Sequence, residues 1–254
     1  MKTLYRRPET LQPCPTHYCA GCGHGIGHRL VAEVIDELGI RERVIGLAPV
    51  GDAVLAHQYL KLDMCEPAHG RLAAVATAIK RVRPECVVFS YQGDGDLAAI
   101  GMGETIHAAN RGDAISVFFI NNAVYGMTGG QMAPTTLLEQ RTTTTPKGRE
   151  AATHGHPIRI CELLATLDAP AYIERVALSS PERIRQAKRA IRKSFLTQIE
   201  RGAYSLVELL SPCPTYWRLS PIESMRFIEE HMVKTFPLGV FRDWQAAPTE
   251  KAPV

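Results

Sequence analysis

Two short segments of the chain carry side chains that could bind a metal ion and a phosphate group. They are Gly93-Asp94-Gly95 and Asn121-Asn122. The carboxylate of Asp94 and the amide oxygen of Asn122 are hard ligands, and a backbone carbonyl just beyond Asn122 could supply a third oxygen. Mg²⁺ prefers such a set, with its other octahedral positions filled by diphosphate oxygens and water. Because glycine lets a backbone approach a ligand closely, the predicted chemistry is the binding of a metal–diphosphate group.

The spacing of the two segments supports this prediction. Asp94 and Asn122 are 28 positions apart, which leaves room for one crossover helix and one strand and would place the segments side by side. Each follows a predicted strand, over residues 86–91 and 114–120, and ligands of open α/β sheets bind at the carboxyl ends of strands. Two unrelated tight turns would leave the spacing and the strand context unexplained.

Predicted helices and strands alternate along the chain. Apolar residues at helical spacing predict helices over 25–38, 72–82, 97–109, 161–167 and 181–200. Short apolar runs predict strands over 44–47, 86–91, 114–120, 172–177 and 204–209. Such strands favour an α/β fold with a mainly parallel sheet and helices on both faces. The polar stretch over 127–156 is too long for an ordinary connection and is expected to be a functional loop.

Composition and charge narrow the class of protein. The chain has 254 residues, of which 45% are hydrophobic, as in an ordinary packed domain. A formal net charge of +3, with basic residues scattered over expected helix faces, argues against a nucleic-acid partner. Because no apolar signal region and no run of about 18 apolar residues is present, we expect a cytoplasmic protein without a membrane segment. The seven cysteines are expected to be thiols or metal ligands rather than disulfides.

Cys19 and Cys22 form a Cys-x-x-Cys pair, and Cys213 is a distant third cysteine. Haem attachment requires histidine directly after the second cysteine, but Gly23 stands there. A thioredoxin-like redox pair would follow a strand, and none is predicted before Cys19. A zinc site and an iron–sulfur cluster both remain compatible with the spacing.

At these motifs the sequence resembles the thiamine-diphosphate enzymes, whose cofactor motif begins with Gly-Asp-Gly and ends with Asn-Asn. Further segments are similar to the thiamine-diphosphate-binding (beta) subunit of 2-oxoacid:ferredoxin oxidoreductases, and the similarity covers roughly residues 15–235. These segments are Cys19-Ala20-Gly21-Cys22-Gly23, Ala68-His69-Gly70-Arg71, Tyr125 to Gln131, Ala133 to Thr136 and Ser211 to Thr215. Ala48 to Gly51 and Gln131 to Thr136 look most like the 2-oxoisovalerate-type, branched-chain members.

The resemblance assigns roles residue by residue. It implies that Mg²⁺ is bound by the side chains of Asp94 and Asn122 and by the carbonyl of Val124. It places His69 and Arg71 near the cofactor and the substrate, as catalytic residues, although His69 could instead cap a helix that begins near Gly70. The residues that it implies for holding the cofactor's diphosphate are Gly93, Gly95, Thr128 and Gly129, together with Asp94 and Asn122.

The resemblance favours a [4Fe-4S] cluster over zinc, with one departure from the family's pattern. Cys19, Cys22 and Cys213 match three of the four cysteine ligands, but Asp52 stands at the position of the fourth. Asp52 could ligate iron through oxygen, or Cys14 or Cys65 could substitute; the cluster could otherwise be three-iron, labile or absent. We hypothesise a retained cluster with an unusual fourth ligand.

The resemblance also implies a reaction and partners. The complex would decarboxylate a 2-oxoacid oxidatively, transfer the acyl group to coenzyme A and reduce ferredoxin. The expected order of substrates is branched-chain, aryl, pyruvate and 2-oxoglutarate. Ylid formation would need a glutamate from a pyrimidine-binding domain on an alpha-type subunit, and gamma- and delta-type subunits would carry ferredoxin-like clusters. The chain is therefore expected to be inactive alone and to work as a heteromer.

Two other functions remain to be weighed. A non-oxidative thiamine-diphosphate decarboxylase or synthase subunit would use Asp94 and Asn122 but not the three cysteines. A zinc-stabilised nucleotide-binding module would leave the Gly-Asp-Gly to Asn-Asn spacing unexplained. We expect one domain over 1–254 that binds thiamine diphosphate and Mg²⁺, with an N-terminal cysteine-containing segment over 1–24 and a C-terminal extension over about 211–254.

Overall fold

A seven-stranded sheet forms the centre of the protein in a computed structural model, which describes residues 6–245. The strand order is β2-β1-β3-β4-β6-β5-β7, and all neighbours pair in parallel except β5 and β7, which are antiparallel. The strands are β1 (Val44–Leu47), β2 (Asp63–Cys65), β3 (Val87–Gly93), β4 (Ser116–Asn121), β5 (Tyr172–Ala177), β6 (Ser205–Leu210) and β7 (Gly239–Asp243). The mainly parallel sheet confirms the predicted fold class.

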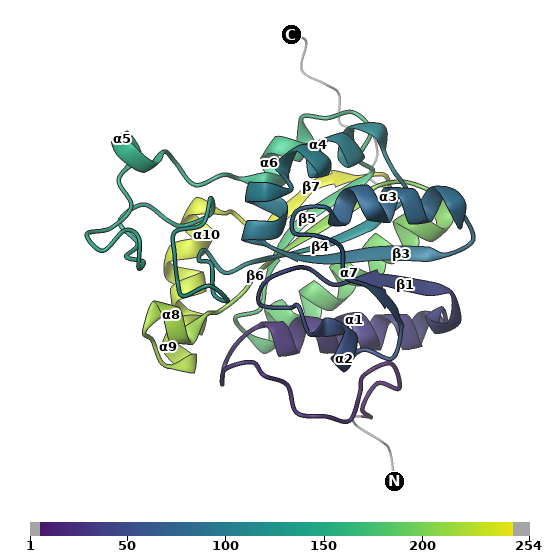
Figure 1. Cartoon of the computed structure of the whole chain (residues 1–254), viewed down its shortest axis with the longest axis horizontal. Coiled ribbons are helices and arrows are strands. Elements are labelled where there is room, and N and C mark those ends of the chain that lie inside the picture. The colour runs from purple at the N-terminus through teal and green to yellow at the C-terminus, as the bar shows by residue number, and fades with distance from the viewer. Residues whose placement is uncertain (1–5, 246–254) are drawn as a thin grey trace.

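Helices cover both faces of the sheet, as Figure 1 shows. One face carries α1 (His24–Leu38) and α7 (Pro181–Arg201), which pack against each other. The other face carries α3 (Leu72–Val82), α4 (Met102–Arg111) and α6 (Ile160–Ala165). Shorter helices occur in the connections and after β6. They are η1 (Arg41–Arg43), α2 (Ala56–Tyr59), η2 (Asp96–Ile100), α5 (Ala151–His154), α8 (Pro214–Trp217), α9 (Pro221–Phe227), η3 (Ile228–Met232) and α10 (Val233–Thr235).

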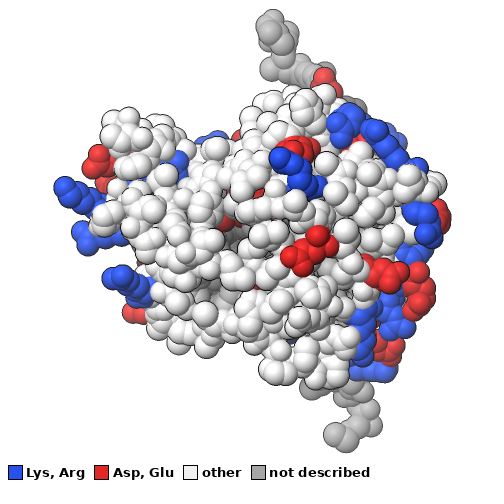
Figure 2. Space-filling model, in the orientation of Figure 1, with Lys and Arg blue, Asp and Glu red and all other residues white. Residues whose placement is uncertain are grey.

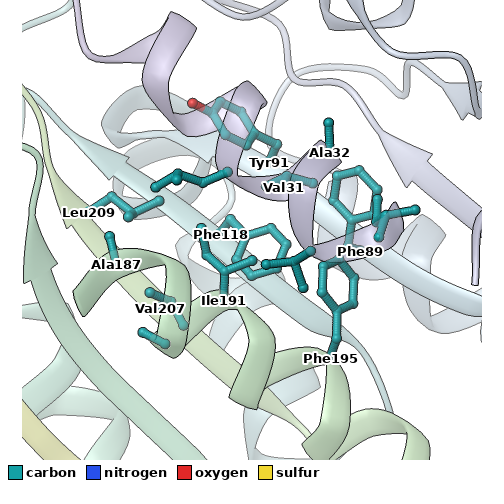
Figure 3. Close-up of a cluster of buried hydrophobic side chains, with 14 of the residues drawn as sticks. Val31, Ala32, Phe89, Tyr91, Phe118, Ala187, Ile191, Phe195, Val207 and Leu209 are labelled. Carbon is teal, nitrogen blue, oxygen red and sulfur yellow. The ribbon is translucent and has the colours of Figure 1, made fainter. Parts of the chain in front are cut away.

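The hydrophobic core lies on both sides of the central strands, because β3, β4 and β6 are buried along almost their whole length. Between the sheet and the α1–α7 layer, the rings of Phe89, Phe118 and Phe195 meet at centroid distances of 5.2–5.9 Å. Figure 3 shows this cluster with Val31 and Ile191. Burial of each such side chain contributes about 1.5–3 kcal/mol, so this layer fixes the position of α1.

The predicted elements recur with small changes at their ends. Strands 44–47 and 172–177 and helix 72–82 are found with the predicted bounds. The predicted helix over 97–109 is wrong as a single element, since it is divided into the π-helix η2 and the α-helix α4. The break falls at Gly101, where a Cβ atom would lie 2.7 Å from the carbonyl oxygen of Gly70. Close packing of these two backbones, which the sequence pattern does not reveal, interrupts the helix.

The short elements at the margins of the sheet were not predicted. β2 has three residues and β7 is an antiparallel edge strand, so neither produces a buried apolar run. Residues 246–254, the end of the expected C-terminal extension, lie outside the described residues. No helix in the described range 6–245 is long and apolar enough to cross a membrane.

His28 on α1 makes the fold sensitive to acid. It is buried against Tyr91 and its Nε2 is 2.8 Å from the hydroxyl of Tyr18. Burial, aided by His24 and His17, lowers the pKa of His28 to about 3, from 6.5 in an unfolded chain. The unfolded state therefore binds this proton first, and stability present above pH 6.5 is lost as the pH falls from 6.5 toward 3.

We predict that His28→Gln, whose amide can still bond Tyr18, reduces this acid sensitivity. From pH 7.5 to pH 5, the wild type should lose about 2 kcal/mol more of its unfolding free energy than the variant does. Urea denaturation followed by circular dichroism at the two pH values measures the difference. Equal losses for the two proteins would show that His28 is not the responsible group.

Candidate functional site

The predicted site residues lie on loops that leave four neighbouring strands. Because β1, β3, β4 and β6 are parallel and adjacent, their carboxyl ends meet at one edge of the sheet. Asp52 follows β1, Asp94 follows β3, Asn122 follows β4 and Cys213 follows β6. Residues spread over more than half of the sequence therefore lie at one edge of the sheet. For Asp94 and Asn122, their spacing in the sequence had predicted this.

Asp94 is a buried carboxylate held by neutral donors. It accepts hydrogen bonds from the backbone N–H of Gly95 (3.0 Å), the N–H of Val124 (3.2 Å) and the hydroxyl of Thr135 (3.1 Å). Burial and the charge of Asp52 raise the pKa of Asp94 to about 8, against the lowering effect of these bonds. A bound cation would compensate the negative charge of this buried carboxylate, so the site has the electrostatics of a cation-binding position.

The turn after β4 presents Asn122 and Val124 beside Asp94. Ala123 has a left-handed backbone with φ of 57°, which disfavours a residue with a Cβ. Three bonds hold it: Asn121 accepts from the Ala123 N–H (3.1 Å), Thr136 donates to the Ala123 carbonyl (2.7 Å), and Trp217 donates to the Asn122 carbonyl (3.0 Å). The strained turn is thus fixed from both sides.

A buried ion pair holds Asn121, the last residue of β4 before this turn. Glu208, on β6, accepts a hydrogen bond from the Asn121 amide (2.8 Å) and pairs with Arg175 of β5 at 2.8 Å. Arg175 also pairs with Glu162 at 2.5 Å. Glu208 and Arg175 are both buried, on β6 and β5, so their ion pair holds the Asn121 side chain in one orientation.

The Asp94 and Asn122 side chains open into a cavity of about 390 Å³. Its walls include His24, Asp52, His69, Tyr125 and Thr128. A Cβ atom on Gly93 would meet nothing within 4 Å, so this glycine leaves open space beside the carboxylate. The volume, the open glycine and the oxygen ligands fit a diphosphate-bearing cofactor with a divalent cation.

The cavity brings together most, but not all, of the predicted cofactor and catalytic residues. His69, Gly93, Gly95 and Thr128 line it with Asp94 and Asn122. Gly129 lies in the next turn, with its N–H bonded to the Gly126 carbonyl at 3.2 Å. Arg71 does not line the cavity, and its guanidinium pairs with Glu104 at 2.6 Å.

His69 does not cap a helix. Its Nδ1 lies 2.7 Å from a carboxylate oxygen of Asp96, and α3 begins only at Leu72 without a side-chain cap. The alternative of a capping histidine is therefore wrong.

The three cysteines line a second, smaller cavity of about 200 Å³. Cys19, Cys22 and Cys213 share it with Asp52, whereas Cys14 and Cys65 do not line it. The Cys-x-x-Cys loop is pressed against the turn after β6, because a Cβ atom on Gly23 would lie 2.2 Å from the Ser211 hydroxyl. Within residues 6–245, no three His, Cys, Asp or Glu side chains are already grouped as a metal site.

Burial of the thiols controls their protonation. It raises the pKa of Cys22 to about 11 and that of Cys213 to about 12, with a further contribution from Asp52 in each case. Both side chains are therefore thiols at neutral pH when they bind no metal. Metal coordination deprotonates such thiols, so ligation by these side chains would release protons.

Asp52 stands between the two cavities and lines both of them with Gly126 and Met127. One carboxylate oxygen of Asp52 accepts a bond from the Asn122 amide (3.1 Å) and lies 3.7 Å from Nε2 of His24. A Cβ atom on Gly126 would lie 2.5 Å from that same oxygen. The carboxylate thus contacts the predicted metal ligand Asn122 on one side and shares a cavity with the cysteines on the other.

The sequence reasoning missed the residues that orient the site. Thr135, Trp217 and Asp96 contact predicted site residues, and Glu208 contacts Asn121 beside Asn122. Thr135 lies in the segment Ala133 to Thr136, which resembles the family, but no role was assigned to any of the four residues. Asp96 offered one signal, since it repeats the Gly-Asp pattern of Asp94 at the start of a predicted helix.

Comparison with known proteins adds independent findings. The family model "Thiamine pyrophosphate enzyme, C-terminal TPP binding domain" matches residues 50–208. Ketoisovalerate oxidoreductase subunit VorA of Methanothermobacter thermautotrophicus is 51% identical over 98% of the chain and 54% of the relative. The 2-oxoglutarate synthase subunit KorB of Methanocaldococcus jannaschii is 34% identical over 90% of the chain and 82% of that protein.

A solved structure agrees with these relatives. The 2-oxoglutarate:ferredoxin oxidoreductase from Magnetococcus marinus, with 2-oxoglutarate, coenzyme A and succinyl-CoA bound, superposes with a TM-score of 0.76 and 25% identity. The match covers 98% of this chain and 88% of that chain. The chain therefore belongs to the thiamine pyrophosphate enzymes, as a beta-type, thiamine-diphosphate-binding subunit of the 2-oxoacid:ferredoxin oxidoreductases. It spans about half the length of the ketoisovalerate oxidoreductase subunits that it matches.

We predict opposite effects of Asp94→Asn on cofactor binding and on stability. Mg²⁺-dependent binding of thiamine diphosphate should weaken by more than about 100-fold, because an anionic ligand is lost. The unloaded protein should melt at a higher temperature at pH 7.5, since the raised pKa of Asp94 means that ionising this buried acid costs stability as the pH rises from about 4 to about 8. Calorimetric titration and thermal denaturation measure the two effects.

Asp113→Asn is the matched control for Asp94→Asn, because Asp113 is a largely buried carboxylate just before β4, at the opposite edge of the sheet. It should leave cofactor binding unchanged. Retained binding in Asp94→Asn would remove Asp94 from the cation site.

Proposed function

We propose that the chain binds thiamine diphosphate and Mg²⁺ in a complex that oxidatively decarboxylates a 2-oxoacid with coenzyme A, yielding acyl-CoA, CO₂ and reduced ferredoxin. The observation that carries this proposal is the pair of adjacent cavities at one sheet edge. One holds the oxygen ligands Asp94 and Asn122, and the other holds three cysteines. A non-oxidative thiamine-diphosphate enzyme has no use for the second cavity.

The residues of the larger cavity suit Mg²⁺ and a diphosphate. Asp94 and Asn122 would bind the cation through side-chain oxygens, and Val124 through its carbonyl. Gly93, Gly95 and Thr128 line the space where the diphosphate would lie, and Gly129 follows them on the same loop. Thiamine diphosphate supplies an electron sink for decarboxylation when bound. The chain would contribute the Asp94 carboxylate as the counter-charge to Mg²⁺, the fixed orientation of the ligands, and the walls that limit access of water.

The residues of the smaller cavity suit an iron–sulfur cluster, and we propose a [4Fe-4S] cluster there. Three thiols from two loops face one space, which is the arrangement that cluster ligation requires. Asp52 lines the same cavity where Cys14 and Cys65 do not, so we propose Asp52 as the fourth ligand. An oxygen ligand would change the potential of the cluster. The shared wall of Asp52, Gly126 and Met127 would place the cluster next to the cofactor.

The relatives favour a branched-chain substrate. The ketoisovalerate oxidoreductase subunits are 51% identical to this chain, against 34% for the 2-oxoglutarate synthase subunit cited above. We therefore propose 2-oxoisovalerate as the first substrate to test, ahead of aryl 2-oxoacids, pyruvate and 2-oxoglutarate.

We propose that the chain is a single cofactor-binding domain that acts in the cytoplasm with partner subunits. An alpha-type subunit would supply the pyrimidine-binding domain, and gamma- and delta-type subunits would pass electrons to ferredoxin. The cavity has exposed apolar residues at its walls, namely Val50, Ile100 and Met127. Figure 2 shows a broad face with few charged side chains at its centre, as at the core of a protein interface.

Metal analysis tests the proposal. The chain alone, reconstituted anaerobically with iron and sulfide, should contain about four irons and give an EPR signal on reduction with dithionite. Asp52→Cys should retain the iron and shift the signal, while Cys22→Ser should lose most of it. Cys65→Ser is the matched control and should change neither.

The outcomes separate the candidate functions. Thiamine diphosphate bound without iron or sulfide would support the non-oxidative enzyme. An unchanged signal in Asp52→Cys, with iron present, would show that Asp52 is not a ligand.

Dependence on partners is a separate prediction. The chain alone should show no coenzyme A-dependent reduction of methyl viologen by 2-oxoisovalerate, because the proposed alpha-type subunit would supply the glutamate that activates the cofactor. Addition of the partner subunits should restore turnover. Activity of the purified single chain would contradict this assignment.

A further inference from the structure

Asp96 is a buried acid that the proposed metal site does not use. It is 1% exposed at the start of η2, and both of its carboxylate oxygens accept hydrogen bonds. One oxygen accepts from the Gly70 N–H at 2.8 Å and contacts Nδ1 of His69 at 2.7 Å; the other accepts from the Gln92 amide at 2.7 Å. Asp96 therefore lies in a fixed position between strand β3 and the loop that carries His69 and Gly70.

The loop that carries His69 is built to reach Asp96. Gly70 has φ of 77°, and a Cβ atom there would lie 2.5 Å from the Ile100 side chain and 2.8 Å from the Gly101 nitrogen. Only glycine permits this approach, which seats His69 over the first turn of η2. On the other side, the Ser90 hydroxyl donates to Oε1 of the Gln92 side-chain amide at 2.9 Å, which turns the Nε2 amino group of Gln92 toward Asp96.

The contact with Asp96 decides which nitrogen of His69 is free. A carboxylate only accepts, so Nδ1 must carry a proton to bond with it. The opposite atom, Nε2, lies 3.7 Å from the position that a Cβ atom on Gly95 would occupy, and His69 and Gly95 both line the cofactor cavity. A neutral His69 thus presents a lone pair at Nε2 to whatever the cavity binds.

We propose that Asp96 is a positioning residue that acts through His69. It holds the imidazole as the Nδ1–H tautomer, with Nε2 directed into the cavity toward the 2-oxoacid. The catalytic part of this inference rests on the proposed function, whereas the tautomer is a property of the chain alone. His69 would then be the residue that exchanges a hydrogen bond with the substrate, and Asp96 would fix its orientation.

Nitrogen-15 NMR of the unloaded chain with labelled histidine tests the tautomer directly. His69→Gln identifies the resonances of His69 by their loss. In the wild type, His69 should show a protonated Nδ1 and an unprotonated Nε2 at pH 8. Asp96→Ala should release the ring to the Nε2–H form that histidine favours in water. Asp96→Asn keeps an acceptor oxygen and should retain the Nδ1–H form, and Asp113→Ala should leave it unchanged.

A double-mutant cycle in the assembled complex tests the catalytic part, with 2-oxoisovalerate, coenzyme A and methyl viologen. Asp96→Ala should lower kcat on the order of 100-fold with little change in KM, and should lower it less than about threefold further in a His69→Gln background. Additive losses would overturn the claim that Asp96 acts through His69. A wild-type Nε2–H tautomer would overturn the positioning role, whatever the activity. Absence of turnover in the wild type, with the Nδ1–H form observed, would instead count against the proposed function.

Discussion

The electrostatics of the site are dominated by two carboxylates that lie close together in a region largely closed to water. Asp94 is buried at the end of β3, and Asp52 from the loop after β1 raises the pKa of Asp94 and contacts Asn122. Like charges so placed are unfavourable unless a cation lies between or beside them. Neutral donors, not basic side chains, surround Asp94. A bound cation would therefore stabilise the site. Much of the surrounding structure holds the two carboxylates in place.

Hydrogen bonds and one buried ion pair hold that surrounding structure in place. The left-handed Ala123 costs on the order of 1 kcal/mol, and bonds from Asn121 and Thr136 offset this cost. Behind them, the buried Glu208–Arg175 pair fixes Asn121. A buried pair of this kind is weak evidence for stability but confers orientation. Here it supports the one turn whose backbone must present Asn122 and Val124 toward Asp94.

The two cavities lie next to each other because of the order of the strands. β1 and β4 flank β3, and β6 is the next strand after β4, so the loops that carry Asp52, Asp94, Asn122 and Cys213 emerge next to one another. The Cys-x-x-Cys segment precedes α1, and its close contact with Ser211 brings it to the same edge. A wall shared by the proposed cofactor site and the proposed cluster site would suit short-range transfer of electrons. This geometry accounts for the use of so many distant segments in building the two cavities.

The sequence by itself determined the α/β class, most of the helices and strands, and the pairing of Asp94 with Asn122. Apolar periodicity and the 28-residue spacing can be read from the sequence without knowledge of the fold. Only the tertiary structure decided that Asp52 lies between two cavities, that Arg71 pairs with Glu104, and that Asp96 contacts His69. Only the tertiary structure shows that the helix predicted over 97–109 is interrupted at Gly101, where its backbone meets that of Gly70. These features depend on contacts between segments far apart in the chain, and no local pattern encodes the distance between them.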